Sequence, residues 1–430
     1  MTKIHDILKR FWGYDSFRPL QEDIITSVLD GHDTLALMPT GGGKSICFQV
    51  PALALEGVCI VVTPLIALMK DQVAQLKQRG IKAQALFSGM RPREIDIALD
   101  NCVYGDTKFL YLSPERLKTK LFQERLQKMN VSLLAVDEAH CISQWGYNFR
   151  PPYLTIAQVR KFIPDVPCIA LTATATQNVC IDIQEHLEFR EGHQFFRKSF
   201  ARENLSYSCF KEENKLERLL KILRGVQGSS VVYVRNRRKT QEITELLRKQ
   251  NVSADFYHAG LDMKERSQKQ EAWIKNQIRV IVATNAFGMG IDKPDVRLVV
   301  HLDIPDNLEA YYQEAGRAGR DEQKAYAVLL YDQKDTEGLL QRLEMSHPSL
   351  EIIKRVYQAI ANRYQIPVGS GELASYDFEM KELTKPYNLK ATEVHYGLKR
   401  LEEQGLVHLT EAVFQSARLM VQVSREALET

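Results

Sequence analysis

The stretch Met38-Pro-Thr-Gly-Gly-Gly-Lys-Ser45 decides the fold, because it follows an apolar run at residues 34–38 and opens into a helical pattern near Ser45. Glycines let successive backbone N–H groups curl around an anion, and the helix N-terminus adds its dipole. Lys44 is expected to reach the β and γ phosphates of a nucleotide, while the Ser45 hydroxyl binds magnesium. The expected cradle comprises Thr40, Gly41, Gly42, Gly43, Lys44 and Ser45.

The same rhythm of a short apolar run followed by a helical pattern continues along most of the chain. Such alternation is typical of parallel sheets covered by helices. A first stretch, residues 1–205, has strand candidates at 34–38, 58–63, 109–113, 133–137 and 168–172. A second stretch, residues 206–335, has strand candidates at 230–234, 254–257, 279–283, 298–302 and 325–330. Residues 198–214 have few strong apolar runs and are expected to form the connector.

The last part of the chain, residues 336–430, has a different pattern. We expect helices at 350–364, 378–383 and 392–404, a break at 369–371, and Gly405 as a helix C-cap. Two short strands are expected at 407–409 and 419–423. This order of helix, helix and hairpin predicts a winged helix, although other small helical domains share part of it.

Size and composition set the class of protein. A chain of 430 residues exceeds the size of one growing core, so two or three domains are expected. No apolar run approaches the roughly 20 residues that span a bilayer, and the N-terminus lacks the apolar core of a signal peptide. We therefore expect a cytoplasmic, intracellular protein without a membrane partner. The net charge of +3 identifies no partner, so a nucleic-acid site requires a local cluster of positive charge.

A second chemical signal lies in Leu133-Leu-Ala-Val-Asp-Glu-Ala-His140. An apolar strand that delivers an acidic pair at its end is suited to holding Mg²⁺ and polarising a water molecule. We expect Asp137 to hold the metal, directly or through water, and Glu138 to act as the base for the attacking water.

Several further motifs resemble those of RecQ-family DNA helicases in superfamily 2. Residues 141–151, Cys-Ile-Ser-Gln-Trp-Gly-Tyr-Asn-Phe-Arg-Pro, are similar to the family's aromatic-rich loop. Residues 17–21, Phe-Arg-Pro-Leu-Gln, preceded by Gly13-Tyr14, resemble its adenine-reading motif. Further similar stretches are 63–72, 113–116, 171–175, 257–261, 281–293 and 312–320. The resemblance covers about residues 5–335 and implies two tandem RecA-like parallel-sheet domains, with ATP and Mg²⁺ as cofactors.

The residue types in these motifs suit base and nucleic-acid contacts. The Gln21 amide can pair with adenine N6 and N7 while Tyr14 and Arg18 stack on the base, although a polar helix start explains the same residues. In the aromatic loop, Trp145, Phe149 and Arg150 combine stacking faces with positive charge, which suits unpaired bases; core packing is the alternative for both aromatic rings.

The resemblance implies that the aromatic loop couples DNA binding to ATP hydrolysis. Where the family has His-Asp, this chain has Tyr147-Asn148, which removes a titratable group and a carboxylate. We therefore expect weaker stimulation of ATP hydrolysis by DNA than in a typical family member.

The second stretch, residues 206–335, contains the arginines that are expected to act on the nucleotide. By resemblance Arg320 is the first choice for an arginine finger and Arg317 the second, with Gln313 near the γ-phosphate or the attacking water. His258 is implied to contact a single strand or to couple the two activities; the alternative is a surface histidine. The basic residues 235–239 either hold phosphates at a helix start or form a solvated face.

The function implied is DNA-stimulated ATP hydrolysis that drives 3′-to-5′ movement on single-stranded DNA and unwinding of duplex DNA, in DNA repair or recombination. We expect a monomer, and no feature of the sequence indicates a protein partner. The alternatives are an RNA helicase and a non-catalytic winged-helix DNA-binding regulator. Residues 141–151 favour the DNA group, and the set Lys44, Asp137, Glu138 and Arg320 argues for an enzyme.

No structural zinc is expected, although most RecQ proteins have a four-cysteine zinc site after the motor. No CxxC pair occurs, and no cysteine follows Cys209. We expect reduced core thiols at Cys47, Cys59, Cys102, Cys141, Cys168, Cys180 and Cys209. Elemental analysis of the purified protein should detect no stoichiometric zinc. One zinc per chain would contradict this prediction and require a site made of histidines and carboxylates.

Overall fold

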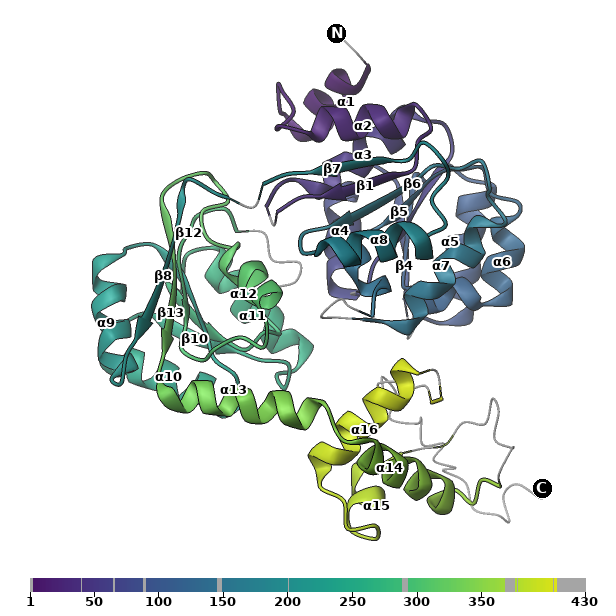
Figure 1. Ribbon diagram of the computed structural model, residues 1–430. Helices are drawn as coiled ribbons and strands as arrows, with labels where there is room; N and C mark the ends of the chain where they lie inside the picture. The colour runs from purple at the N-terminus through teal and green to yellow at the C-terminus, as the bar shows by residue number, and fades with distance from the viewer. Residues whose placement is uncertain are drawn as a thin grey trace, which may run out of the picture. The chain divides into compact units, whose positions relative to one another are not determined.

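The computed structural model describes residues 3–39, 41–64, 66–87, 90–144, 149–199, 201–287, 293–367, 376, 378–404 and 406–407. Two parallel sheets, each covered by helices, occupy most of this chain, as Figure 1 shows. We call the part that carries strands β1–β7 the first lobe and the part that carries strands β8–β13 the second lobe. Both lobes are RecA-like parallel-sheet domains.

The first lobe has seven strands in the order β3-β4-β2-β5-β6-β1-β7, and all their pairings are parallel. Its strands are β1 Thr34–Leu37, β2 Val58–Val62, β3 Ala83–Leu86, β4 Phe109–Leu112, β5 Val131–Val136, β6 Cys168–Thr172 and β7 Gln194–Arg197. Its helices are α1 Lys3–Trp12, α2 Gln21–Leu29, α3 Lys44–Ala54, α4 Ile66–Gln78, α5 Pro92–Val103, α6 Lys120–Leu126, α7 Ile156–Arg160 and α8 Gln177–His186.

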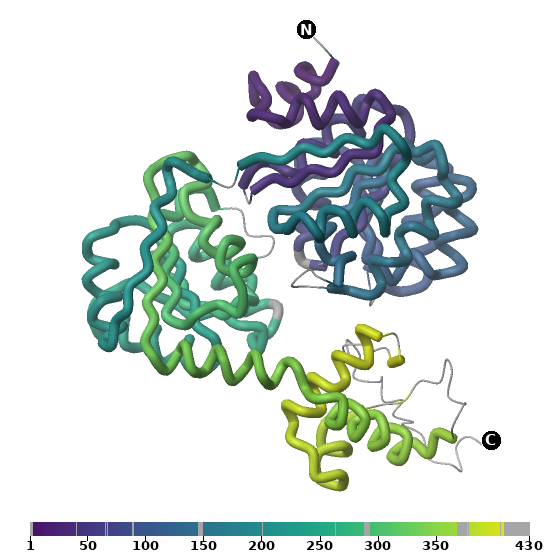
Figure 2. The backbone as a smooth tube through the Cα atoms, viewed as in Figure 1, coloured from purple at the N-terminus to yellow at the C-terminus, as the bar shows by residue number. Residues whose placement is uncertain are grey.

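The second lobe has six parallel strands in the order β10-β11-β9-β12-β13-β8. Its strands are β8 Leu205–Lys211, β9 Ser229–Tyr233, β10 Ala254–Tyr257, β11 Val280–Ala283, β12 Val296–His301 and β13 Ala325–Tyr331. Its helices are α9 Lys215–Gly225, α10 Arg237–Lys249, α11 Met263–Ile274 and α12 Leu308–Ala315. The backbone trace in Figure 2 shows the chain entering this lobe after β7 and leaving it through α13, Gln333–Ser346.

A separate compact unit begins at Arg342. It contains α14 Leu350–Arg363, α15 Met380–Thr384 and α16 Ala391–Glu403, which pack around a small apolar core. These helices lie close to the three expected from the sequence, with the second shifted by two residues at its start. The expected break at 369–371, the cap Gly405 and the strand at 419–423 lie outside the described residues, as does most of the strand at 407–409.

All ten strands expected within residues 1–335 form within two residues of their expected ends, but three strands of the two lobes were missed. β3 and β7 are edge strands of the first sheet, and β8 is an edge strand of the second. β8 corrects the expected connector at 198–214, because Leu205–Lys211 pairs along its length with β13. Edge strands bury less of their side chains, so their sequences lack the continuous apolar run of central strands.

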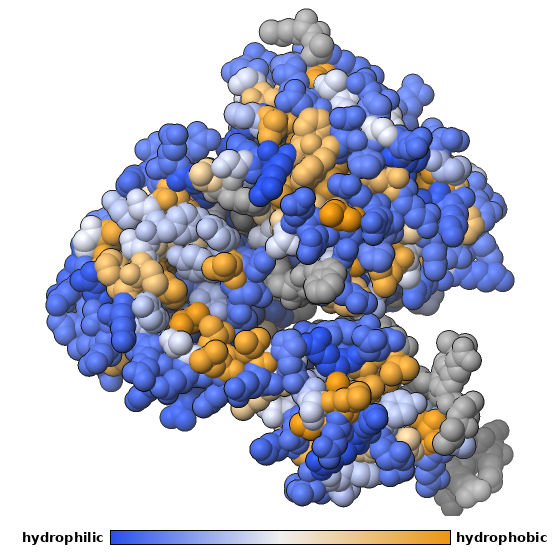
Figure 3. Space-filling view, viewed as in Figure 1, coloured by the Kyte–Doolittle hydropathy of each residue, from blue (hydrophilic) through white to orange (hydrophobic). Residues whose placement is uncertain are grey.

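The surface and the thiols agree with a large apolar interior. On the viewed face, Figure 3 shows hydrophobic residues gathered in separate patches within a largely hydrophilic surface. No helix among the described residues has the length and apolar character needed to cross a membrane. All seven cysteines are free thiols, and six are buried as expected, whereas Cys209 on β8 is exposed.

A buried carboxylate fixes the start of β1. Asp33 accepts hydrogen bonds from Arg160 Nη2 at 2.6 Å, from the Cys168 N–H at 2.8 Å and from the Arg190 N–H at 2.8 Å. Its backbone carbonyl accepts from the Gln194 N–H at 2.8 Å. Asp33 therefore joins the starts of β1, β6 and β7. Burial alone would raise the pKa of Asp33, but the bonds from Arg190, Arg160 and Cys168 outweigh it and lower the pKa.

Replacing this carboxylate should destabilise the first lobe. Asp33→Ala is expected to reduce the free energy of unfolding in urea by roughly 3–5 kcal/mol, because it leaves buried arginine charge unpaired. Since the folded-state pKa is lowered, the advantage of the wild type should be complete at pH 7 and shrink as the pH falls below about 4. The control Asp106→Ala, which breaks an exposed pair with Lys82, should change the free energy of unfolding far less, because solvent screens that pair. Equal effects of the two substitutions would contradict the prediction.

Candidate nucleotide and nucleic-acid site

The phosphate loop lies between the end of β1 and the start of α3. Lys44 is the first residue of α3, as the motif requires, and Gly43 precedes it as the cap. Gly41 and Gly43 have φ of 81° and 76°, a region that favours glycine, so side chains at these positions would strain the loop. Thr40 lies outside the described residues. The loop therefore directs backbone N–H groups and the N-terminal end of α3 toward one point.

The expected base-reading residues lie against this loop. Arg18 Nη1 donates to the Gly41 carbonyl at 2.6 Å. The Gln21 amide is buried and donates to the Gly43 carbonyl at 3.1 Å, while its oxygen accepts from the Arg18 N–H at 2.8 Å. Tyr14, four residues before Arg18 in the chain, is 54% exposed. In this ligand-free arrangement Gln21 holds the loop, so base recognition requires its amide to exchange these bonds for bonds to adenine.

The acidic pair follows β5 and is surrounded by protein. Asp137 is 7% exposed and accepts from the Glu138 N–H at 2.9 Å. Glu138 has a φ of 49°, which turns the chain sharply after the strand. Burial, and after it the charge of Glu138, raise the pKa of Asp137 to about 7 against the opposing charge of Lys44. Because Lys44 lowers the pKa that Glu138 raises, the lysine and the two carboxylates share one electrostatic environment.

His140 links the acidic pair to β6. Its Nδ1 lies 3.4 Å from Glu138 Oε2 and 2.9 Å from Thr172 Oγ1. Burial lowers the pKa of His140, which favours the neutral ring at physiological pH. Thr172 also receives the Thr174 N–H at 3.3 Å, so the residues after β6 are joined to Glu138 through one histidine.

A buried chain of polar side chains supports Ser45, and the sequence alone did not reveal it. Gln49 donates to the Tyr111 hydroxyl at 3.2 Å, and that hydroxyl donates to Gln72 Oε1 at 2.8 Å. Gln72 Nε2 then donates to Ser45 Oγ at 3.4 Å. The chain connects α3, β4 and α4 beneath the phosphate loop. Gln72 belonged to a motif quoted above, but only the structure supplies its partners.

The two candidate arginines occupy different environments. Arg317 is 7% exposed and hydrogen-bonds Tyr233 inside the second lobe. Arg320 lies at the edge of the first lobe, where a methyl group built on Gly41 would meet its Cγ at 3.0 Å. The structure therefore brings Arg320 to the phosphate loop and places Arg317 against the core of the second lobe. Gln313 lies on α12, and both arginines follow this helix in the chain.

The phosphate loop and Arg320 both line a cleft of about 380 Å³. The first lobe contributes Arg18, Gly41 and Gly42 to its lining. The segment between the lobes contributes Lys198, Arg202 and Asn204, of which none was singled out from the sequence. Four cations line the cleft against two carboxylates, Glu203 and Glu322, and this excess of positive charge is suited to a polyphosphate.

The expected nucleic-acid residues are described only in part. Trp145 and the Tyr147-Asn148 pair lie outside the described residues. Phe149 is half-buried, and Arg150 Nη1 donates to the Pro64 carbonyl at 3.2 Å, which joins the end of this loop to the residues after β2. His258 is 6% exposed, so it is not a surface histidine. Burial lowers the pKa of His258, and the charge of Arg237 lowers it further.

The basic residues 235–239 are largely engaged within the second lobe. Arg235 pairs with Asp306 at 2.7 Å, Arg238 with Glu242 at 2.7 Å, and Lys239 with Asp303 at 2.5 Å. Arg237 is exposed at the start of α10 and approaches Gly260. Of these four cations, Arg237 is the one whose position suits a phosphate.

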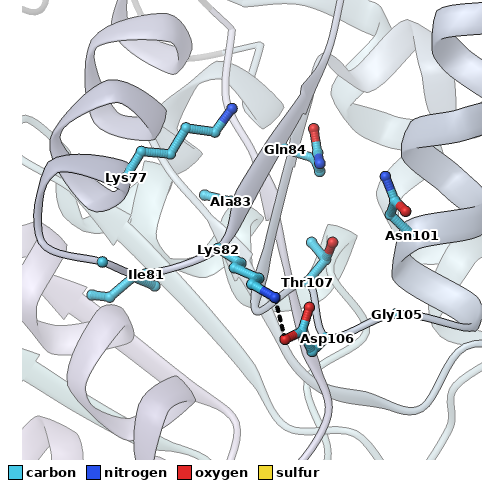
Figure 4. A pocket seen from close by; sticks show the side chains of 10 residues that line it. Lys77, Ile81, Lys82, Ala83, Gln84, Asn101, Gly105, Asp106 and Thr107 are labelled. Carbon is cyan, nitrogen blue, oxygen red and sulfur yellow. Dashed lines mark hydrogen bonds and ion pairs between the residues drawn. The ribbon is translucent and has the colours of Figure 1, made fainter.

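A second cavity, of about 420 Å³, lies at the opposite edge of the first sheet. Figure 4 shows Lys77, Gln84 and Asn101 around it, with Lys82 paired to Asp106. It is lined by residues that precede β3 and β4, whereas the phosphate loop follows β1. In a parallel sheet the amino ends of the strands lie on one side and their carboxyl ends on the other. This cavity lies at the amino ends of its strands, so it is not part of the nucleotide site at the carboxyl ends.

The ionisation of Asp137 generates a test of stability. Because its pKa is raised to about 7, the folded protein retains a proton that the unfolded chain loses near pH 4. Asp137→Asn should therefore raise the free energy of unfolding of the ligand-free protein, by about 1–3 kcal/mol at pH 8. This gain should be complete above pH 7 and vanish as the pH falls toward 4. Asp33→Asn, which removes a paired carboxylate, should have the opposite sign, and a pH-independent effect of Asp137→Asn would contradict the assignment.

Comparison with known proteins was made on both sequence and structure. Residues 18–181 match the DEAD/DEAH box helicase family, and residues 214–322 match the helicase conserved C-terminal domain. The ATP-dependent DNA helicase RecQ of Pasteurella multocida is 43% identical over 354 residues, which are 81% of this chain and 56% of that protein. The chain thus spans little more than half of this relative. The structure of DEAD-box helicase Mss116 bound to ssRNA and UDP-BeF has a TM-score of 0.66 at 17% identity, covers 94% of this chain and 93% of that one, and shows likeness of fold.

The probable ATP-dependent DNA helicase RecS of Bacillus subtilis covers nearly the whole chain. It is 38% identical over 425 residues, which are 98% of this chain and 82% of RecS. The matched residues contain the phosphate loop, the acidic pair after β5 and the arginines after α12. The two parallel sheets and the order of these motifs agree with that match, and the chain belongs to the RecQ family of superfamily 2 DNA helicases.

Proposed function

We propose that this chain is an ATP-dependent DNA helicase, an ATP hydrolase that moves 3′-to-5′ on single-stranded DNA and unwinds duplex DNA. The observation that carries the proposal is the cleft in which Arg320 of the second lobe faces Gly41 of the phosphate loop. Hydrolysis that needs both lobes can be coupled to their opening and closing, which is how a two-lobed motor converts chemistry into movement.

The nucleotide is proposed to bind with its phosphates on residues 41–45 and its adenine near Tyr14, Arg18 and Gln21. Lys44 contacts the β and γ phosphates, and Glu138 takes the proton of the attacking water. Ser45 and Asp137 would hold Mg²⁺, which when bound neutralises phosphate charge. The residues fit that ion, because Asp137 is a buried carboxylate whose pKa is already raised and the Ser45 hydroxyl is oriented by Gln72.

Transition-state charge is proposed to be stabilised by Arg320. Arg320 lies in the turns that follow α12, directly after Gly319, whose φ of 61° allows the chain to turn sharply there. Arg317, being buried against Tyr233, would support this turn from within the lobe, and Gln313 would lie near the γ-phosphate or the water. No zinc is proposed.

The single strand is proposed to run past Trp145, Phe149, Arg150 and His258. The bond from Arg150 to Pro64 supports this path, because it ties the aromatic loop to the motif after β2. Family membership supports DNA over RNA. A non-catalytic DNA-binding regulator is less well supported, because Arg320 lines a cleft with the phosphate loop and Lys44 acts on the pKa of Asp137.

The division of the chain is likewise proposed. We assign residues 1–205 and 206–335 to the two motor domains and residues 336–430 to a helical, winged-helix-like DNA-binding region. The start of β8 at Leu205 and the separate core of α14–α16 support these limits. We further propose that the protein acts as a monomer in the cytoplasm, at the nucleoid, in DNA repair or recombination.

A hydrolysis assay tests the proposal. ATP turnover should rise more with single-stranded DNA than with single-stranded RNA, and Lys44→Ala should reduce it on the order of 100-fold or more by removing the phosphate-reaching charge. Glu138→Gln should retain ATP binding but lose turnover, because it keeps the shape of the base without its proton affinity.

The matched control is Lys82→Ala, a lysine at the opposite edge of the same sheet, which should leave kcat within about twofold. Turnover that nucleic acid does not stimulate, or a folded Lys44→Ala variant with near-normal turnover, would overturn the proposed function. Stimulation by RNA alone would favour the RNA helicase.

A further inference from the structure

Two side chains between the lobes hold the turn that carries Arg320. Arg202 Nη1 donates to the Gly316 carbonyl at 3.1 Å, and its Nη2 donates to the Gly319 carbonyl. Asn204 Nδ2 donates to the same Gly319 carbonyl at 2.8 Å and to the Gln323 carbonyl at 2.9 Å. Four hydrogen bonds thus converge on residues 316–323 from two residues that immediately precede β8.

The acceptors are those that a helix end leaves open. α12 ends at Ala315, and the carbonyls of the last turn of a helix have no partner within the helix. They also form the negative end of its dipole, where a cation is favoured. The Arg202 guanidinium donates to the carbonyl of Gly316 at the end of α12 and to the carbonyl of Gly319 in the following turn. One side chain therefore holds both ends of the segment that contains Arg317.

The fit around Gly319 is tight. A methyl group built on Gly319 would lie 2.6 Å from Asn204 Nδ2 and 2.9 Å from the Gln323 carbonyl. Gly319 also donates its N–H to the Val296 carbonyl at 2.8 Å, so the residue before Arg320 is held from β12 as well. The backbone from which Arg320 extends therefore has little freedom while Arg202 and Asn204 keep their bonds.

The same two residues line the nucleotide cleft beside Arg320. Arg202 and Asn204 share that lining with Lys198, Gly41 and Arg320. They belong to the segment that joins β7 of the first lobe to β8 of the second. A change in the path of this segment is therefore transmitted directly to the turn before Arg320.

We propose that Arg202, together with Asn204, is a positioning residue that sets Arg320 against the phosphate loop. Arg202 acts on the backbone carbonyls of the turn and Arg320 acts on the nucleotide. The inference rests on the arginine-finger role proposed above for Arg320. It predicts that Arg202 supports turnover only when Arg320 is present.

A double-mutant cycle tests this dependence with the full chain. Arg202→Ala should lower the DNA-stimulated kcat on the order of 10-fold, with the Kd of a fluorescent non-hydrolysable ATP analogue changed by less than about threefold. Arg320→Ala should lower kcat further, and the double variant should turn over no more slowly than Arg320→Ala alone. Arg202→Lys, which keeps the charge and a donor, should recover part of the loss and guards against a folding defect of the alanine variant.

Arg279→Ala provides a matched control. Arg279 also donates its guanidinium to backbone carbonyls of the second lobe, those of Leu223 and Val226, but it lies at the start of β11. Its replacement should lower the melting temperature while leaving kcat at a permissive temperature within about twofold.

The outcomes separate the inference from the function on which it rests. The positioning role would be overturned if kcat of the double variant fell by the product of the two single losses, or if Arg202→Ala greatly raised the Kd of the ATP analogue. Either result would mean that Arg202 acts on the nucleotide itself. A loss of kcat in Arg279→Ala equal to that in Arg202→Ala would also overturn it. By contrast, full turnover by Arg320→Ala would remove the arginine finger, and absence of turnover in the wild type would remove the proposed hydrolysis.

Discussion

The constraint on which the site depends is the parallel direction of the strands. Because every pairing in both sheets is parallel, the carboxyl ends of all strands in a lobe lie on the same side of its sheet. In the first lobe that side receives the phosphate loop after β1, the acidic pair after β5 and Thr174 after β6. These residues are distant in sequence and meet through strand direction alone. Asp33 secures the arrangement from the other side, because it ties the start of β1 to both of its neighbours.

Two buried aspartates in this lobe have pKa values that are shifted in opposite directions. Asp33 is surrounded by hydrogen-bond donors, so its pKa is lowered and its charge stabilises the fold. Asp137 lies beside another carboxylate with one cation nearby, so its pKa is raised and its charge destabilises the ligand-free protein. Structural carboxylates are satisfied by the protein, whereas a carboxylate intended for a ligand retains an unmet demand for positive charge.

The sequence predicted those features that are encoded by neighbouring residues. Lys44, Asp137 and Glu138 follow central strands whose apolar runs are continuous, so their places at the sheet edge could be predicted. β7 and β8 were missed because these edge strands expose most of their side chains, and β3 because its four residues alternate too little in apolar character to stand out. Contacts between distant residues were also missed: the Gln21 amide on the loop, the Tyr111 relay to Ser45 and the Arg202 bonds after α12. Each involves side chains far apart in sequence, for which no periodicity exists.

The place of β1 within its sheet has a consequence for biosynthesis. β1 is made early, yet it lies between β6 and β7, which are the last two strands of the lobe to be synthesised. At ordinary translation rates, roughly 10–30 s separate the synthesis of Leu37 from that of Arg197. For most of that interval the apolar strand β1 has neither of its two neighbouring strands to pair with. Pairing with β6 becomes possible only once Thr172 has been made, and the other side of β1 stays open until β7 follows.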